Sequence, residues 1–566
     1  MDRTVLNSAN GEDPEPTSIS SGGKKGGWTT FPFTIATVAG IALAFGGLTG
    51  NLIVYLIQEF NIRSISAAKI FNVVNGCTTI LPIAAAIIAD SFTGCYSVIW
   101  ISSLISSLGL LIIVLTAAIS KLRPPHCENG SNLCKYPSEV QLAVLYIGLA
   151  LGSIGMAGTR FTIGSMGANQ FDKPKHQGIF FNWYIFTMYM ATGISSTLIV
   201  YIENSVSWTL GFGICVAANI FALAIFLAGS GFYHHLKPQG SPFVRLARVI
   251  VASFRKRKMV LSLKSEDYFQ GPDTADYKVT TFPSKFFKFL NRAALRAEGE
   301  TEPDGSTRQP WKLCTVQDVE DFKRIIKIFP LWSTGFFLST PLVILGSLSV
   351  LQALAMDRHL GPHFQIPAGS VFLFTLMPTC FTVFLLDRFL FPLGEKFTGH
   401  PVRPLQRVGI GHLLDIVGLA VLALVEAKRL KIARLHDLQG QDNAVVPMSV
   451  FWLVPPLAIA GIGEAFFFPG QIDFYYQEFP ASLKSTSTAA VALYMGIAYY
   501  LGNAVIDLVR RTRGWLPDDL NKGRLDNVYW LVCVLAGLNF CYYLVCSYFY
   551  KYQNVETVKV TDESTV

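Results

Sequence analysis

Long apolar runs separated by polar segments dominate the pattern of hydrophobic and polar positions along this chain. A membrane-spanning helix needs roughly 20 mostly apolar residues. The pattern predicts twelve such spans, near residues 31–58, 68–89, 95–120, 140–167, 179–202, 208–231, 325–354, 368–391, 405–426, 447–476, 485–509 and 527–550. We therefore predict an all-α integral membrane protein with twelve transmembrane helices.

A long polar segment, residues 232–324, interrupts this series after the sixth span. It divides the chain into an N-terminal six-helix bundle over residues 28–231 and a C-terminal six-helix bundle over residues 325–551. The linker holds many basic residues, which favours a cytoplasmic location, because positive residues are retained on that side of a membrane. The polar ends, residues 1–27 and 552–566, are expected to be disordered and cytoplasmic.

Two features of the charge pattern leave alternatives open. The short basic runs Lys428–Lys431 and Arg510–Arg513 fall on the predicted outer side, against the usual bias of positive residues. Within the linker, residues 243–264 alternate basic and apolar positions. This segment is either an amphipathic helix on the inner leaflet or a solvated tether between the two halves.

The composition agrees with a membrane protein and excludes several other classes. The 566 residues are 51% hydrophobic and only 15% charged, whereas about 25% charged is usual for a soluble domain. The net charge of +8 does not point to nucleic acid, because much of the basic charge lies in the linker, opposite an anionic leaflet. The sequence holds no zinc-protease, hydrolase or phosphate-binding motif, so we expect neither an enzyme nor a metal or cofactor site.

A polar loop between the third and fourth predicted spans carries candidate modification sites. Cys127 and Cys134 flank it, and Asn129 begins an Asn-Gly-Ser glycosylation pattern. On the extracellular side these cysteines are candidates for a disulfide. The alternative is two free thiols and an unmodified asparagine.

Arg160 is the one formally charged residue in the apolar stretch 140–167. An arginine at the centre of a membrane helix costs about 2.5–3.5 kcal/mol on insertion scales. Its neighbours Gly158, Thr159 and Thr162 are small or hydroxylated, which favours a side chain that faces a pore. The alternative is a side chain that extends to the membrane boundary, about 10 Å of helix away.

Glu464 is the clearest acidic residue within a predicted span of the C-terminal half. A lone carboxylate in lipid is costly unless it is protonated or paired. Because Glu464 and Arg160 have opposite charges and lie in different halves, we predict that they form a gating pair, closed in one state and open in another. Asp507 lies close to the end of a span, where an interfacial position is expected.

Several segments of the chain, spread over residues 26–552, resemble the plant nitrate/peptide transporter family, the proton-dependent oligopeptide transporter branch of the major facilitator superfamily. The matching segments are Gly26-GWTTFPF-Thr34, Asp90-SFT-Gly94, Gly167-ANQF-Asp172, Phe180-FNWYI-Phe186, Met356-DRHL-Gly361, Thr398-GHPVRPLQRVGI-Gly411 and Gly463-EAFFFPGQIDFYYQEF-Pro480. The resemblance implies the major facilitator fold, with two six-helix bundles and a substrate path between them.

The chain departs from the family pattern where protons are usually coupled to transport. The family's first-span Glu-x-x-Glu-Lys/Arg motif aligns with Val38, Ile41 and Ala42, none of which binds a proton. The family's fourth-span lysine aligns with Arg160, whose planar guanidinium suits oxyanions. A seventh-span position that is histidine in a nitrate-transporting member aligns with Leu342.

Because it lacks the first-span motif, the chain resembles a subgroup of this family that is associated with nitrate or chloride efflux. Relatives of that subgroup carry glycosides. The resemblance implies a secondary transporter of a small anion or a polar, glycosylated metabolite, with export and weak proton coupling. The alternatives are a dedicated nitrate or chloride efflux carrier and a solute sensor that does not transport. Its partners would be that solute and the lipid bilayer of the plasma membrane or, second in preference, the vacuolar membrane.

Overall fold

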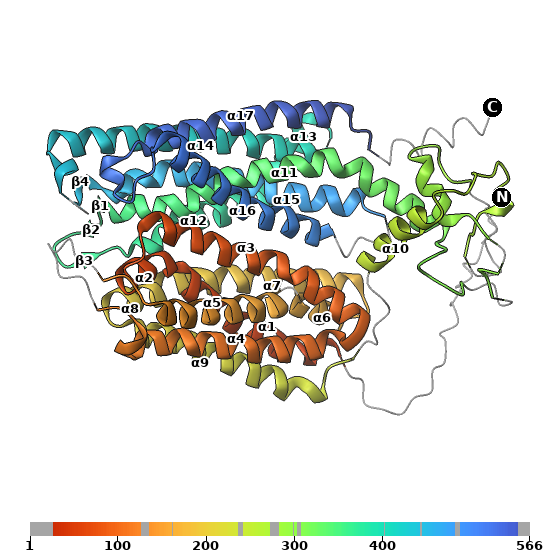
Figure 1. Ribbon diagram of the computed structural model, residues 1–566, viewed down its shortest axis with the longest axis horizontal. Helices are drawn as coiled ribbons and strands as arrows, with labels where there is room; N and C mark the ends of the chain where they lie inside the picture. The colour runs from red at the N-terminus through yellow and green to blue at the C-terminus, as the bar shows by residue number, and fades with distance from the viewer. Residues whose placement is uncertain are drawn as a thin grey trace, which may run out of the picture.

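The computed structural model describes residues 26–125, 135–160, 162–235, 242–271, 282–297, 299–302, 307–400, 402–441, 444–480 and 487–552. Within these ranges the chain folds mainly into long helices that run side by side (Figure 1). The all-α membrane architecture predicted from the apolar runs is therefore confirmed. A small linker subdomain lies at one end of the molecule, which we call the linker end; the opposite end is the far end (Figure 1).

The helices form two groups, with the N-terminal group below and the C-terminal group above in Figure 1. The first group contains α1 (Phe31–Gly50), α2 (Leu52–Gln58), α3 (Ser64–Ile88), α4 (Gly94–Ala118), α5 (Glu139–Arg160), α6 (Thr162–Ala168), α7 (Pro174–Ile194), α8 (Val200–Ser205) and α9 (Trp208–Ala228). The second contains α11 (Val316–Leu354), α12 (Leu373–Leu385), α13 (Phe391–Thr398), α14 (Pro404–Leu435), α15 (Val454–Glu478), α16 (Ser487–Arg513) and α17 (Leu525–Phe549).

Eleven continuous helical stretches of the described residues are long and apolar enough to cross a membrane, one fewer than the twelve predicted spans. The difference arises at Ser64–Ala118, a single stretch of 55 residues. Its length of about 82 Å, at about 1.5 Å per residue, far exceeds the roughly 30 Å hydrocarbon core. It contains α3 and α4, which correspond to the second and third predicted spans, and Gly94 turns the chain between them with a φ of 78°.

Short π-helical segments interrupt three of the long stretches, at Ala89–Thr93, Ser195–Ile199 and Leu386–Leu390. A π-helical turn adds a residue to the helix and redirects the helix that follows. In the second segment the Ser195 hydroxyl donates a hydrogen bond to the Leu43 carbonyl of α1, at 2.9 Å. This irregularity therefore fastens α7 to α1.

Two small sheets lie at the far end of the molecule (Figure 1). The strands β1 (Met356–Asp357) and β4 (Val446–Ser449) pair in parallel, and β2 (His359–Leu360) pairs antiparallel with β3 (Phe364–Gln365). The ring of Phe364 stacks on Tyr201 of the N-terminal group, with centroids 5.6 Å apart. Strands this short leave no readable alternation in the sequence, so they were not predicted.

The linker is partly folded into a subdomain with its own apolar core. The helix α10 (Pro242–Arg255) buries Val249 and Ala252 against the linker and the start of α11. The core residues are Val249, Ala252, Tyr268, Leu290, Ala293, Ala294, Leu295, Cys314, Val316 and Val319. The solvated-tether alternative for this segment was therefore wrong, because part of its apolar surface packs on protein. The segment does contain the amphipathic helix of the other alternative, and Ile250 and Phe254 of α10 are exposed, so its contact with the inner leaflet stays a prediction.

The long helix α11 connects the linker subdomain to the C-terminal group. It begins at Val316, nine residues before the predicted span, and continues for 39 residues. A capping box fixes its start: the Asp318 amide donates to the Thr315 hydroxyl at 3.0 Å, and the Thr315 amide donates to the Asp318 carboxylate at 3.2 Å. The helix α11 thus runs without interruption from the linker subdomain into the C-terminal group.

A buried ion pair lies near the far end of α14. Arg429 and Glu426 are both fully buried and approach to 2.7 Å. The Gln352 amide of α11 donates to Glu426 at 2.6 Å, and Arg429 donates to Asn521 at 2.6 Å. One of the basic residues that contradicted the expected charge bias is therefore an internal structural cation, held away from the membrane surface.

Candidate functional site

Arg160 lies at the end of α5, where it faces α1 and α7 of the same half. Its guanidinium carbon lies 5.1 Å from the centroid of the Phe45 ring on α1. The Tyr184 hydroxyl of α7 donates a hydrogen bond to the Arg160 carbonyl at 2.7 Å. The first contact places the guanidinium beside α1, and the second fastens the backbone of Arg160 to α7. The pore-facing alternative stays a prediction.

Close packing of α5 on α4 positions this arginine. A Cβ added to Gly155 would lie 2.2 Å from the Ser106 amide nitrogen, and one added to Gly158 would lie 2.0 Å from the Ser102 hydroxyl. Only glycine allows the two helices to approach this closely. Any larger residue would push the end of α5, and Arg160 with it, away from α4.

A small cavity lies beside Arg160 within the N-terminal half. Its volume is about 30 Å³. The lining residues are Val38, Ile41, Ala42, Phe45, Met156, Arg160, Ile163, Tyr184, Met188 and Thr192. Arg160 is the one charged residue in that lining, so the cavity offers a single cation in an otherwise apolar and weakly polar wall.

The three substituted motif positions lie in this same cavity wall. Val38, Ile41 and Ala42 line it together with Arg160. The sequence alignment predicted only that these positions had lost their acids and base. The structure adds that the loss leaves Arg160 facing aliphatic side chains, where carboxylates would otherwise compete for its charge.

Glu464 approaches from the C-terminal half, on α15. Tyr189 of α7 and Tyr499 of α16 each lie within the electrostatic influence of both Arg160 and Glu464. The predicted gating pair therefore stays a prediction, with its two members near shared tyrosines in this conformation.

A second acid, Asp415 of α14, lies next to Glu464. Its side chain is only 2% exposed, and neither carboxylate oxygen has a hydrogen-bond partner within the described part of the chain. A Cβ added to Gly463 would lie 2.4 Å from the Asp415 carboxylate. The sequence placed Asp415 in or near a span but gave no sign that it packs directly against the helix that carries Glu464.

Polar contacts join the two halves toward the far end. The Lys69 ammonium of α3 contacts Asp507 of α16 at 2.7 Å, and Asn72 donates to Asn503 at 2.9 Å. The Ser370 hydroxyl donates to the Ser196 carbonyl at 2.7 Å. Asp507 lies near the end of α16, where an interfacial position was expected, and the structure adds that it is half of an ion pair between the halves.

The predicted disulfide and glycosylation sites lie in a loop that the structure does not describe. Cys127, Asn129 and Cys134 lie outside the described residues, so the disulfide and the glycosylation stay predictions. No cluster of metal-binding side chains occurs among the residues that the structure describes.

The sequence model described as "PTR2: POT family" matches residues 96–519. The chain belongs to the POT family. This POT family member is therefore a multi-pass membrane transporter and not an enzyme.

Relatives match this POT transporter over nearly its full length. NRT1/PTR FAMILY 2.7 of Arabidopsis thaliana is 51% identical over 554 residues, which cover 98% of each chain. NRT1/PTR FAMILY 2.6 of the same plant is 50% identical over 547 residues, covering 97% of each. The resemblance to the plant nitrate/peptide transporter family is thereby confirmed.

Solved structures of POT transporters share the fold. An auto-inhibited POT family peptide transporter superposes with a TM-score of 0.69 at 17% identity, covering 92% of this chain and 97% of that one. The POT family transporter PepTSo gives a TM-score of 0.62 with the same identity and coverage. These likenesses confirm the major facilitator fold.

Breaking the ion pair between the halves is expected to loosen the far end. Lys69→Met removes the cation that holds Asp507, and both side chains are about one-third exposed. Such pairs contribute up to about 1 kcal/mol, so the population open at the far end should rise by up to about fivefold. Labelling of a cysteine introduced at Asn72 by a membrane-impermeant reagent measures this shift.

The reversed pair, Lys69→Asp with Asp507→Lys, serves as the control because it restores the attraction. Its labelling rate should return toward that of the protein with the cysteine alone. Equal labelling in all three backgrounds would show that the ion pair does not hold the far end closed.

Proposed function

We propose that this POT transporter carries a small inorganic anion, with Arg160 as the cation that binds it. The observation that carries the proposal is the cavity in which Arg160 is the one charged lining residue, opposite Val38, Ile41 and Ala42. A guanidinium has a permanent charge and presents parallel donors to an oxyanion. With the motif acids gone, no neighbouring carboxylate of α1 competes with the anion for that charge.

The size of the cavity favours nitrate or chloride over a glycoside. A cavity of about 30 Å³ is two to three times the roughly 10–15 Å³ that one water requires. A glycosylated metabolite would need the two halves to separate further around Arg160. It is the second candidate, supported by the aromatic side chains of Phe45 and Tyr184 in the wall, which suit a ring.

Glu464 would act on Arg160 in another state of the cycle. With the linker end in the cytoplasm, the contacts between the halves at the far end correspond to a conformation that faces inward. Closure of the linker end would bring α15 toward α5, and Glu464 would then replace the anion as the partner of Arg160. Binding of the anion to Arg160 and formation of the ion pair with Glu464 would thus be alternatives, and the anion would leave as the pair forms.

Export follows from the charge of the cargo if no proton accompanies it. The plasma membrane is our preferred location, and its interior is electrically negative. Each 100 mV of potential is worth about 2.3 kcal/mol for one charge that crosses the membrane. An anion that crosses without protons is therefore driven outward.

Transport is expected to depend on membrane potential far more than on a pH gradient. In proteoliposomes loaded with nitrate, a gradient of one pH unit is worth about 1.4 kcal/mol, or tenfold accumulation, to a carrier that moves one proton per cycle. Here it should change the initial nitrate flux by less than about twofold. A potential set with potassium and valinomycin should change the flux strongly. A relative that retains the first-span motif provides the control.

The same assay tests the alternative roles. A stoichiometric proton current with nitrate would show that transport is coupled to protons through another acidic residue. Glu464 would be the first candidate for that residue and Asp415 the second. Saturable nitrate or chloride binding without any flux would favour a sensor. If the protein transported a glycoside but neither nitrate nor chloride, the choice of an inorganic anion as cargo would be overturned.

A further inference from the structure

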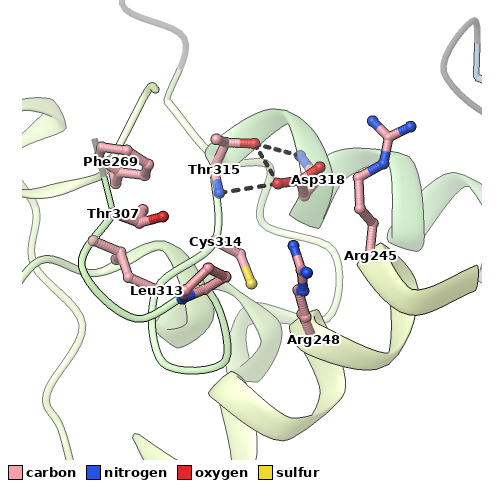
Figure 2. Close-up of a pocket in the computed structure, with 9 residues that line it drawn as sticks. Arg245, Arg248, Phe269, Thr307, Leu313, Cys314, Thr315 and Asp318 are labelled. Carbon is pink, nitrogen blue, oxygen red and sulfur yellow. Dashed lines mark hydrogen bonds between the residues drawn. The ribbon is translucent and has the colours of Figure 1, made fainter. Parts of the chain in front are cut away.

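A second and larger cavity lies outside the membrane helices, in the linker subdomain between α10 and the start of α11 (Figure 2). Its volume is about 210 Å³, below the roughly 300–1,000 Å³ of pockets that enclose drug-sized ligands. The lining residues are Arg245, Arg248, Phe269, Thr307, Pro310, Leu313, Cys314, Thr315 and Asp318. The transport function assigned to Arg160 makes no use of this site.

Two arginines of α10 give the cavity a positive wall. Arg245 and Arg248 are three residues apart, so they lie on the same face of the helix, one turn from each other. The Nε of Arg248 is buried and has no hydrogen-bond partner within the described part of the chain. A buried donor without a partner costs free energy, which an anionic ligand in the cavity would recover.

The one acid in the wall is already engaged by its own helix. The Asp318 carboxylate accepts hydrogen bonds from the Thr315 amide at 3.2 Å and from the Thr315 hydroxyl at 2.7 Å (Figure 2). Burial raises the pKa of the neighbouring Cys314 thiol to about 12. That thiol is therefore neutral, and the two arginines outweigh the single carboxylate.

The start of α11 adds to this positive potential. Thr315 is the N-cap residue of a 39-residue helix, and it lines the cavity. The amino end of a helix carries a partial positive charge that favours anions. The Thr307 hydroxyl lines the same space and can donate a further hydrogen bond.

We propose that this cavity binds a phosphate group, carried either by a phosphoinositide headgroup or by a soluble phosphate. Paired guanidinium groups match the several oxygens of a phosphate, and a hydroxyl and a helix start complete its coordination. The bound group would contact α10 and α11 together, so it would fasten the linker to the helix that enters the C-terminal bundle. This inference does not depend on which solute the transporter carries.

The test is binding of defined probes to the purified full-length protein, held in detergent for the soluble probes and in lipid nanodiscs for the vesicles. Inorganic phosphate and inositol trisphosphate are titrated by calorimetry. Vesicles of phosphatidylcholine with a phosphoinositide are compared with vesicles that contain phosphatidylserine at equal total charge. Arg248→Gln and Arg245→Gln should each weaken binding about tenfold or more. The matched control is Lys258→Gln, an exposed basic residue of the same linker outside the cavity wall.

Each outcome either distinguishes a soluble phosphate from a lipid headgroup or contradicts the proposed phosphate site. Binding of the soluble probes that both arginine variants weaken, and the control does not, assigns a soluble phosphate. The same pattern seen only with phosphoinositide vesicles assigns a lipid headgroup. No binding of any probe, or equal weakening in Lys258→Gln, overturns the proposal. Arg245 is exposed, so its variant should keep the thermal unfolding midpoint even if Arg248→Gln misfolds.

Discussion

Replacing Arg160 with alanine is expected to lower anion transport strongly while the protein still reaches the membrane. The substitution removes the one charged residue from the wall of the cavity. Hydrogen bonds to a charged group contribute about 1.5–3 kcal/mol, so the loss corresponds to a roughly 10- to 150-fold lower flux at limiting anion. Initial rates of nitrate and chloride flux in proteoliposomes, normalised to the amount of protein, measure the effect.

Two variants separate the charge of Arg160 from its shape and its packing. Arg160→Lys keeps the charge but loses the planar fork, so flux should be intermediate and should fall more for nitrate than for chloride. Met156→Leu changes the cavity wall with little change in volume and should leave the flux nearly unchanged. Full activity in Arg160→Ala would show that the anion does not depend on this cation.

Replacing Arg429 with methionine is expected to cause the largest loss of stability. The change leaves Glu426 as a buried carboxylate without its cation, because both members of this pair are fully buried. Removing one partner of a buried ion pair costs about 3–5 kcal/mol. The purified variant should unfold at a markedly lower temperature in detergent and should be recovered in lower yield.

The double variant Glu426→Gln with Arg429→Met provides the control. It removes both charges together, and buried pairs replaced in this way are often as stable as the original. Much of the lost thermal stability should return, which would identify the unpaired charge as the cause. An unfolding midpoint for Arg429→Met equal to that of the unchanged protein would exclude this account of the pair.

The membrane helices were predictable because the bilayer imposes a length and a composition on each of them. Runs of about 20 apolar residues can be recognised without any knowledge of their neighbours. The same one-dimensional signal found Arg160, because a charge in such a run is rare and costly. Alignment with the family pattern then placed Val38, Ile41 and Ala42, which the structure brings to the same cavity as Arg160.

Pairings between distant segments were not predictable in this way. Lys69 and Asp507 are 438 positions apart, and each looked like an ordinary residue near the end of a helix. Arg429 resembled a surface charge until its buried partner was seen. The linker subdomain was missed for a related reason: its core collects single apolar residues from several short segments, and none of these segments shows a clear period alone.

The continuity of α11 gives the linker a mechanical role. This helix is about 58 Å long, from 39 residues at about 1.5 Å each, and its first turn is packed into the subdomain core through Val316 and Val319. The subdomain is therefore attached to the C-terminal bundle through one continuous helix and moves with it. A small tilt of the C-terminal bundle would move the subdomain at the start of α11 farther than it moves the bundle itself, and a probe on the subdomain would report that tilt.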